Sequence, residues 1–411
     1  DIEKIYFSDH HLSHASSAFF PSPFKEAVVL TAAGVGEWAT TTDAVGKENN
    51  LEIKKEIHFP HSLGLLYSAF TYYVGFKVNS GEYKLMGLAP YGNPIFKDKI
   101  YQLIDVKEDG TFRLDQSYFN YATGLTMINK KFCNLFGQKA RHSEIDKITQ
   151  FHMDIAASIQ IVTEEIILKL VKSIKNDFQC ENLCLAGGVA LNCVANGKII
   201  KENIFKNVWI QPAAGDAGGS LGAALAFWHI DQKNKRKSEI DDSMQGSYLG
   251  PEYSQNQIEN ILKKIGANFE VLNDDEIIEK TALNLSNGKA IGWHQGRMEF
   301  GPRALGSRSI LADPRSIHMQ KNLNLKVKYR ESFRPFAPSV LKDKVESWFD
   351  LNTESPYMLL VSKVKKDKCL EITSEQNNLF GIDKLNIQRS KIPAVTHVDY
   401  TARIQTVTKK K

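Results

Sequence analysis

The amino-acid sequence predicts an α/β fold in which helices cover a sheet, and three observations support this. Short apolar runs typical of buried strands lie at residues 27–31, 183–185, 208–210 and 290–293. Helix-length segments separate these runs, and the longest of them is residues 148–174. A unit of strand, glycine turn and helix occurs twice in succession, with helices at about 190–200 and about 217–228. Strands and helices that alternate in this way are typical of a sheet with helical layers.

The chain is long enough for two domains. Its 411 residues, 42% of them apolar, exceed the roughly 250 to 300 residues at which a single core stops growing. A polar stretch of mixed charge at residues 231–245 is typical of a linker. Two more helices are predicted after it, at about 255–265 and 275–287. The predicted domains are therefore residues 1–235 and 246–411.

Cysteine usage and hydropathy restrict the environment of the protein. The five cysteines are an odd number, and no two of them have the CxxC spacing of a zinc or redox motif. No apolar run is long enough to span a bilayer, and the first residues contain no hydrophobic signal region. We expect a cytoplasmic protein without a membrane partner.

Charge is unevenly distributed along the chain, whose formal net charge is +5. Residues 288–411 contain 23 basic and 12 acidic side chains, whereas the preceding residues contain 29 basic and 35 acidic ones. A basic region of this kind attracts anions. The sequence has neither the interleaved aromatic and basic residues of RNA-recognition modules nor a known DNA-reading motif. Phosphorylated small molecules are therefore the expected ligands, and nucleic acid is not.

The first motif that indicates chemistry is HHLSHASSAFFPSPF at residues 10–24. His10 and His14 are four residues apart and would share one face of a helix. Two imidazoles in this arrangement hold a metal ion when a carboxylate or another ligand arrives from elsewhere in the fold. Asp9 and His11 are candidates for orienting such ligands. A hydrogen-bonded cluster of surface histidines is the alternative.

Two glycine-rich turns form the second group of motifs, LAGGVALNCVANG at residues 185–197 and GDAGGSLGAALA at residues 215–226. Without a Cβ atom, backbone N–H groups at the start of a helix come close to a phosphate. Tight packing with no ligand is the alternative for either turn alone. Two turns in succession, with Asp216 between glycines, favour ligand binding. The candidate binding residues are Gly187, Gly188, Asn192, Gly218 and Gly219.

The third group is basic and comprises GRMEFGPRALGSRSILADPR at residues 296–315 and LKVKYRESFRPFAPSVL at residues 325–341. Glycine and proline interrupt both stretches, so the cations are not the solvated face of one long helix. Guanidinium groups bind phosphate oxygens through two parallel hydrogen bonds, and lysine adds a point charge. A run of surface charges is the alternative. The candidate phosphate-binding residues are Arg303, Arg308, Ser309, Lys328, Arg330 and Arg334.

Together with GVGEWATTT, HSLGLLYSAFTYYVGF, SGEYKLMGLAPYG and PAVTHVDYTARIQTV, these motifs resemble those of NodU/CmcH-type carbamoyltransferases, in order along nearly the whole chain. The resemblance implies an actin/sugar-kinase-like (ASKHA) domain, similar to the enzyme that makes threonylcarbamoyladenosine in tRNA, followed by a YrdC-like α/β domain. It implies that the YrdC-like domain forms carbamoyl adenylate from carbamoyl phosphate and ATP with Mg²⁺. The first domain would transfer the carbamoyl group to a hydroxyl of a small molecule, such as a natural product or an oligosaccharide.

The resemblance also implies a divalent ion, Fe²⁺ or similar, held by His10, His14, Asp216 and a second aspartate. This sequence departs from the family at the second aspartate, because TAAGVGEW has Ala33 at that position. The remaining residues would form a site of two histidines and one carboxylate. Weaker metal binding, or loss of transfer activity, is the expected consequence.

Further candidates come from polar residues within these motifs. His10 and His14 cannot act both as ligands and as the general base, so the base is unassigned and His11 is one candidate. Glu82 and Lys84 are candidates for orienting the adenylate, with a structural ion pair as the alternative. Two polar residues near the end of the chain, His397 and Arg403, are expected to face the pocket.

The resemblance implies family segments before Asp1 and after Lys411, so we expect the chain to be truncated at both ends. The expected partners are ATP, carbamoyl phosphate, a small-molecule hydroxyl acceptor and a second copy of the chain in a homodimer. A non-catalytic nucleotide-binding or regulatory homologue with a broken metal site is the alternative function.

Overall fold

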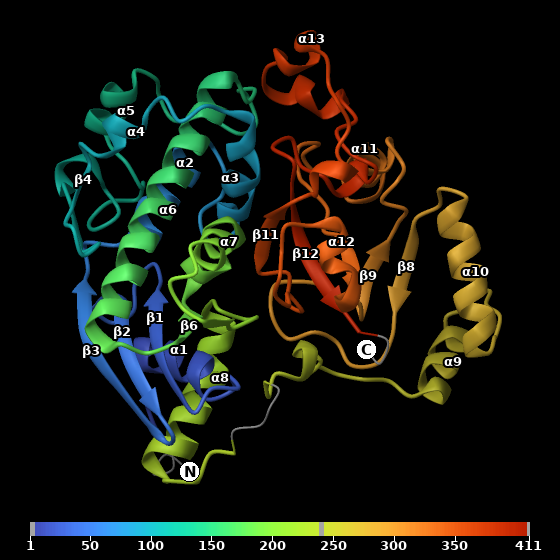
Figure 1. Cartoon of the computed structure of the whole chain (residues 1–411), viewed down its shortest axis with the longest axis horizontal. Coiled ribbons are helices and arrows are strands. Elements are labelled where there is room, and N and C mark those ends of the chain that lie inside the picture. Colours follow the sequence, from blue (N-terminus) through green and yellow to red (C-terminus); the bar gives the residue numbers. More distant parts are fainter. Residues whose placement is uncertain (1–4, 238–241, 409–411) are drawn as a thin grey trace. The chain divides into compact units, whose positions relative to one another are not determined.

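The computed structural model describes residues 5–237 and 242–408, and the chain forms two compact units (Figure 1). Unit 1 comprises Asp1–Ser243, Leu359–Ser362 and Ile372–Ile387. Unit 2 comprises Met244–Met358, Lys363–Glu371 and Gln388–Lys411. Two short segments from the C-terminal half therefore belong to unit 1. The predicted linker at 231–245 falls partly outside the described residues, and the predicted domain limits stay a prediction.

A five-stranded mixed sheet lies at the centre of unit 1, in the order β3-β2-β1-β6-β7. Its strands are β1 (Glu26–Ala32), β2 (Ala39–Lys47), β3 (Asn50–His58), β6 (Asn182–Ala186) and β7 (Asn207–Ile210). β2 pairs antiparallel with both β1 and β3, whereas β1, β6 and β7 run parallel. Six of the seven residues of β1 are buried, because helices cover both faces of the parallel part. This explains the continuous apolar run at 27–31 and confirms the first three predicted strands.

Up to Ser243, unit 1 contains eight α-helices within the described residues (Figure 1). They are α1 (His10–Phe19), α2 (Leu63–Tyr73), α3 (Glu82–Leu88), α4 (Lys97–Ile100), α5 (Lys130–Phe136), α6 (Gln150–Phe178), α7 (Cys193–Lys201) and α8 (Asp216–Ala226). Of these, α1, α2 and α6 contact strands of this sheet. A small hairpin consists of β4 (Ile104–Val106) and β5 (Phe112–Leu114). The long predicted helix is confirmed as α6, which begins with a capping box between Thr149 and His152. The helix predicted at about 190–200 begins instead as a 3₁₀ turn, η4 (Gly188–Leu191), before α7.

The C-terminal part of the chain contains shorter elements. They are α9 (Gln255–Lys264), α10 (Asp274–Ser286), β8 (Ile291–His294), β9 (Arg308–Leu311), α11 (Met319–Asn322), β10 (Ser339–Leu341), α12 (Val345–Trp348), β11 (Leu360–Lys363), α13 (Ser374–Asn377) and β12 (Thr401–Val407). β8 and β9 form an antiparallel pair, and a second sheet has the order β10-β12-β11. The predicted strand at 290–293 and both predicted helices after the linker are confirmed.

The alternating strands and helices confirm the predicted α/β class. Within the part of the chain that the structure describes, no helix is both long enough and apolar enough to cross a bilayer.

Candidate functional site: a histidine and carboxylate cluster beside a glycine turn

α1 and α8 bring together the three side chains predicted to hold a metal. The Nε2 atoms of His10 and His14 lie 3.0 Å apart, and Asp216 Oδ1 lies 3.6 Å from the first and 3.4 Å from the second. Two ligands at about 2.1 Å from one ion, at angles between a right angle and about 120°, are separated by about 3.0 to 3.6 Å. The three residues therefore fit one divalent ion.

Glycine at position 222 allows α1 and α8 to approach this closely. A Cβ atom on Gly222 would lie 1.7 Å from the carbonyl oxygen of Ser13 and 2.8 Å from the backbone nitrogen of Ser17. Any side chain at this position would push the helices apart. The carboxylate of Asp216, at the first residue of α8, would then move away from the histidines.

The cluster is buried at one side and open at the other. The His14 side chain is 0% exposed, that of His10 is 31% exposed and that of Asp216 is 87% exposed. The full burial of His14 argues against the alternative of a surface histidine cluster. Burial, followed by the charge of His10, lowers the pKa of His14 to about 4. The ring is therefore neutral at pH 7, as metal ligation requires.

His11, the candidate general base, lies inside the protein and contacts β2. Its Nδ1 atom is 3.1 Å from Thr42 Oγ1. Its Nε2 atom is buried without a hydrogen-bond partner among the described residues. Burial, followed by the charges of His14 and His10, lowers the pKa of His11 to about 4. The ring is neutral and able to accept a proton, but so low a pKa makes it a weak base and its Nε2 is buried. A role in proton transfer stays a prediction.

Glu37 is a residue of this site that sequence reasoning missed. Its two carboxylate oxygens accept a hydrogen bond from the backbone N–H of His10, at 3.2 and 3.0 Å. The Asp9 side chain, which directly precedes α1, makes no such bond. Glu37 therefore caps α1 from the loop after β1 and places His10 relative to the sheet. The usual cap signature is local in sequence, and this cap is 27 residues away.

Ala33 follows β1, and its carbonyl oxygen is bound by Ser62, the N-cap residue of α2. The Ser62 hydroxyl donates to the carbonyl oxygens of Ala33 and Gly34, at 3.2 and 2.6 Å. Ala33 is 4% exposed, so its methyl group lies in the interior.

We expect the Ala33→Asp variant to bind divalent metal more tightly than the natural chain, because a further carboxylate adds an anionic ligand. The measurement is iron content after equal exposure of both proteins to ferrous iron, with His14→Ala as the metal-poor control. Equal iron content in the Ala33→Asp variant and the natural chain would mean that position 33 does not face the ion.

The glycines of the two turns fall into two classes. A Cβ atom on Gly187 would lie 2.2 Å from the carbonyl oxygen of Ala32, and one on Gly218 would lie 2.1 Å from that of Ala213. Packing alone explains these two glycines. A Cβ atom on Gly188 would meet nothing within 4 Å, and one on Gly219 only His14 Cε1 at 3.9 Å. The space beside Gly188 is therefore open to a ligand.

We expect Gly188→Val to weaken binding of AMP by about tenfold or more, because the new side chain fills the space through which a phosphate reaches the backbone. The fold should be unchanged, since that space is open in the free protein. Calorimetric titration with AMP checks this, with Gly188→Ala as a milder variant. A nucleotide-bound structure in which this turn is empty would count against the assignment.

Asn192 and Glu82, two other predicted residues, have side chains engaged by the protein itself. Asn192 Oδ1 accepts from the backbone N–H of Ala195 at 3.1 Å, which caps α7. Glu82 Oε1 accepts from the Ser68 hydroxyl at 2.8 Å, and backbone N–H groups of Asn79 and Gly81 also donate to the carboxylate. The Lys84 ammonium lies 5.8 Å from the centre of the Phe76 ring. Their predicted roles toward an adenylate are untested.

In unit 2, the loop between β8 and β9 is built around Glu299, a residue that no sequence motif singled out. One carboxylate oxygen of Glu299 accepts from the backbone N–H groups of Leu305 and Ser307, both at 2.7 Å. The Arg308 guanidinium donates to three carbonyl oxygens, those of Gln295, Gly296 and Ser307, at 2.8 to 3.1 Å. Ser309 Oγ accepts from the N–H of Gly306 at 3.1 Å. The loop therefore has a fixed shape.

Three of the predicted phosphate-binding cations are close enough to influence one another. Burial, followed by the charges of Arg330 and Arg334, lowers the pKa of Lys328. The Nε of Arg330 donates to Asn324 Oδ1 at 2.6 Å, and its guanidinium lies 4.7 Å from the centre of the Phe336 ring. Like charges that converge in this way make a region that favours an anion.

The remaining predicted residues lie partly or fully inside unit 2. His397 is 7% exposed, and its Nδ1 lies 3.7 Å from Asp399 Oδ1. Arg403 Nε is buried without a hydrogen-bond partner among the described residues. Arg303 is half-buried in the loop that Glu299 organises.

Two family models match most of the chain. The model for the carbamoyltransferase N-terminus matches residues 1–225, and the model for the carbamoyltransferase C-terminus matches residues 282–411. The chain therefore belongs to the carbamoyltransferase family, which confirms the family predicted from the motifs.

Relatives of known sequence agree with this assignment. The chain is 60% identical to the uncharacterized protein sll1178 of Synechocystis sp., over 99% of this chain and 66% of that protein. It is 38% identical to nodulation protein NolNO of Sinorhizobium fredii, over 100% of this chain and 55% of that protein. It is 35% identical to nodulation protein NolO of Bradyrhizobium diazoefficiens, over 98% of this chain and 68% of that protein. The chain thus spans 55 to 68% of the lengths of these relatives.

Proposed function

We propose that the protein is an ATP-dependent O-carbamoyltransferase, which forms carbamoyl adenylate from carbamoyl phosphate and ATP and transfers the carbamoyl group to a hydroxyl of a small molecule. The observation that supports this best is the convergence of His10, His14 and Asp216 in a chain of the carbamoyltransferase family. The basic residues of unit 2 would form a second site, which binds phosphates. Fe²⁺ and Mg²⁺ are the proposed ions.

In unit 2, Arg303 and the group Lys328, Arg330 and Arg334 would neutralise the phosphates of ATP and carbamoyl phosphate. Because these cations are already in place before the reaction, they would stabilise the negative charge that moves between phosphate oxygens, as in other nucleotidyl and phosphoryl transfers. The loop around Glu299 would hold Arg303 in place, because the backbone N–H groups of Leu305 and Ser307 in this loop already donate to the Glu299 carboxylate. The transfer of the carbamoyl group to the acceptor would then take place in unit 1.

In unit 1, a bound divalent ion would act as a Lewis acid toward the carbamoyl carbonyl. The 87% exposure of Asp216 leaves that side of the cluster accessible to an acceptor. The acceptor oxygen forms a bond to the carbamoyl carbon, the bond to AMP breaks, and AMP leaves with the electron pair. The hydroxyl proton passes to a base, for which His11 is the candidate.

The test is to incubate the protein with ATP, Mg²⁺ and carbamoyl phosphate and to follow the nucleotide products. We expect ATP consumption that depends on carbamoyl phosphate, and AMP release when a hydroxyl acceptor is added. A folded protein that binds ATP but never consumes it would contradict the proposal. That outcome would favour the alternative function, a non-catalytic nucleotide-binding homologue, which Ala33 at the metal site also favours.

A further inference from the structure

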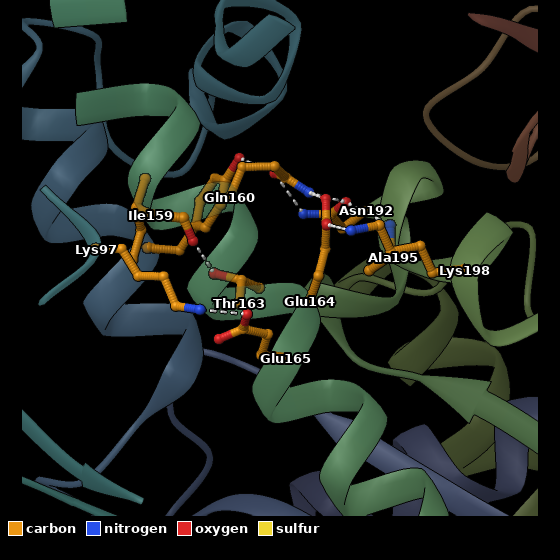
Figure 2. A network of polar contacts seen from close by, with 10 residues as sticks. Lys97, Ile159, Gln160, Thr163, Glu164, Glu165, Asn192, Ala195 and Lys198 are labelled. Atoms are coloured by element: carbon orange, nitrogen blue, oxygen red, sulfur yellow. Dashed lines mark hydrogen bonds and ion pairs between the residues drawn. The ribbon is translucent and has the colours of Figure 1, made fainter. Parts of the chain in front are cut away.

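A buried polar network connects α6 to the first glycine turn (Figure 2). The side-chain amides of Gln160 and Asn192 form a reciprocal pair, in which each nitrogen donates to the other's oxygen at 3.1 Å. Gln160 also accepts from the Tyr67 hydroxyl at 2.9 Å and donates to Glu164 Oε1 at 2.7 Å. Gln160 is 5% and Glu164 is 3% exposed. A network that is buried and paired in this way fixes the orientation of its members, because an unpaired polar group in the interior is costly.

The network reaches α7 at a second point. The ammonium of Lys198 forms an ion pair with the Glu164 carboxylate, whose side chain is 4% exposed (Figure 2). The buried carboxylate needs this partner because an unpaired buried charge is destabilising, whereas the Lys198 side chain is 42% exposed and stays in contact with water. Gln160 and Glu164 therefore hold both the cap and the body of α7, and α7 directly follows the turn.

The same turn is held on its other side by the sheet. Gly187 has a φ angle of +83° and packs so closely on β1 that a Cβ atom would lie 2.2 Å from the Ala32 carbonyl oxygen. The turn is thus fixed at Gly187 by β1 and at Asn192 by α6. Between these two points, the Cα of Gly188 faces open space. A rigid frame around an open backbone position is what a nucleotide site requires.

We propose that Gln160 and Glu164 are positioning residues, which act through Asn192 and Lys198 to set the backbone of the Gly188 turn for an adenylate. Asn192 then serves as a link in the frame and not as a nucleotide ligand. The inference rests on the proposed function, because it assumes that this turn receives the nucleotide.

The neighbouring residue on α6 offers a matched control. Glu165 is also a glutamate paired with a lysine, since its Oε1 lies 2.6 Å from Lys97 Nζ (Figure 2). Its Oε2 accepts from the Tyr101 hydroxyl at 2.7 Å, and neither partner belongs to the network around Asn192. Glu164→Gln and Glu165→Gln therefore remove the same charge from adjacent positions, from a side chain that is 4% exposed in the first case and 36% exposed in the second.

The experiment compares Gln160→Leu, Glu164→Gln and Glu165→Gln with the natural chain, using three measurements. These are the affinity for AMP, the hydrogen-exchange rates of the backbone amides at 187–191, and iron content. We expect Gln160→Leu to lose about tenfold or more in AMP affinity, with faster exchange in the turn and unchanged iron content. Glu164→Gln should show a smaller loss, because its amide still accepts from Gln160. Glu165→Gln should bind AMP within about twofold of the natural chain.

The three measurements separate the inference from the proposed function. Unchanged exchange at 187–191 in Gln160→Leu would overturn the positioning role, whatever the protein binds. If the natural chain does not bind AMP at this turn, the proposed function fails, whereas faster exchange in the variant would still establish that the network fixes the turn. Parallel loss of AMP affinity and iron in Gln160→Leu would indicate general destabilisation and would also overturn the inference.

Discussion

The Arg303→Ala variant should lose ATP consumption driven by carbamoyl phosphate, with a decrease of about 100-fold or more. A guanidinium aimed at a phosphate stabilises the charge that develops during transfer, and removal of one such donor costs about 10² to 10³ in rate. Arg303→Lys should also be impaired, because lysine lacks the two-pronged geometry. The measurement is the rate of ATP loss at saturating carbamoyl phosphate.

Arg315→Ala is the control for this prediction. Arg315 is 68% exposed and makes a two-pronged pair with Asp313 at 2.7 to 2.9 Å. The Arg315 guanidinium is directed to Asp313, so this variant should turn over ATP within about twofold of the natural rate. If Arg303→Ala has the same rate as Arg315→Ala, Arg303 does not contact the reacting phosphates. The Arg308→Ala variant is a less direct probe, because its guanidinium holds three loop carbonyls.

Gly222→Ala should destabilise unit 1 by about 3 kcal/mol or more and should also reduce its metal content. The added methyl carbon would lie 1.7 Å from the carbonyl oxygen of Ser13, and no change of rotamer relieves a clash with backbone. α1 and α8 would have to separate, which moves Asp216 away from His10 and His14. Thermal unfolding and iron content after equal exposure to ferrous iron check both effects.

Gly219→Ala, on the same helix, should not destabilise unit 1 and should leave its iron content unchanged. Its methyl carbon would meet only His14 Cε1, at an ordinary contact distance of 3.9 Å. Replacement of a glycine by alanine within a helix stabilises it by up to about 1 kcal/mol. Equal stability and iron content in the two variants would mean that close approach of the helices does not build the site.

The sequence predicted the parallel part of the sheet well, because β1, β6 and β7 are buried on both faces and appear as continuous apolar runs. It predicted α6 because twenty-nine residues of helix give a long periodic signal. It did not predict β2 or β3. In β3 the alternation of polar and apolar residues is broken by the adjacent Lys54 and Lys55, and most of the strand is exposed. β2 is rich in threonine.

For the site, the sequence alone determined the residue types and their grouping: two histidines at helical spacing, a carboxylate between glycines, two glycine-rich turns and cations close together in sequence. Tertiary structure decided which of them meet. Gly222 brings α8 to α1, Glu37 caps α1 across 27 residues, and Gln160 holds Asn192 across 32 residues. Contacts between residues so distant in sequence depend on where the backbone of each element lies. Local patterns of hydrophobicity, spacing and charge carry no record of that position.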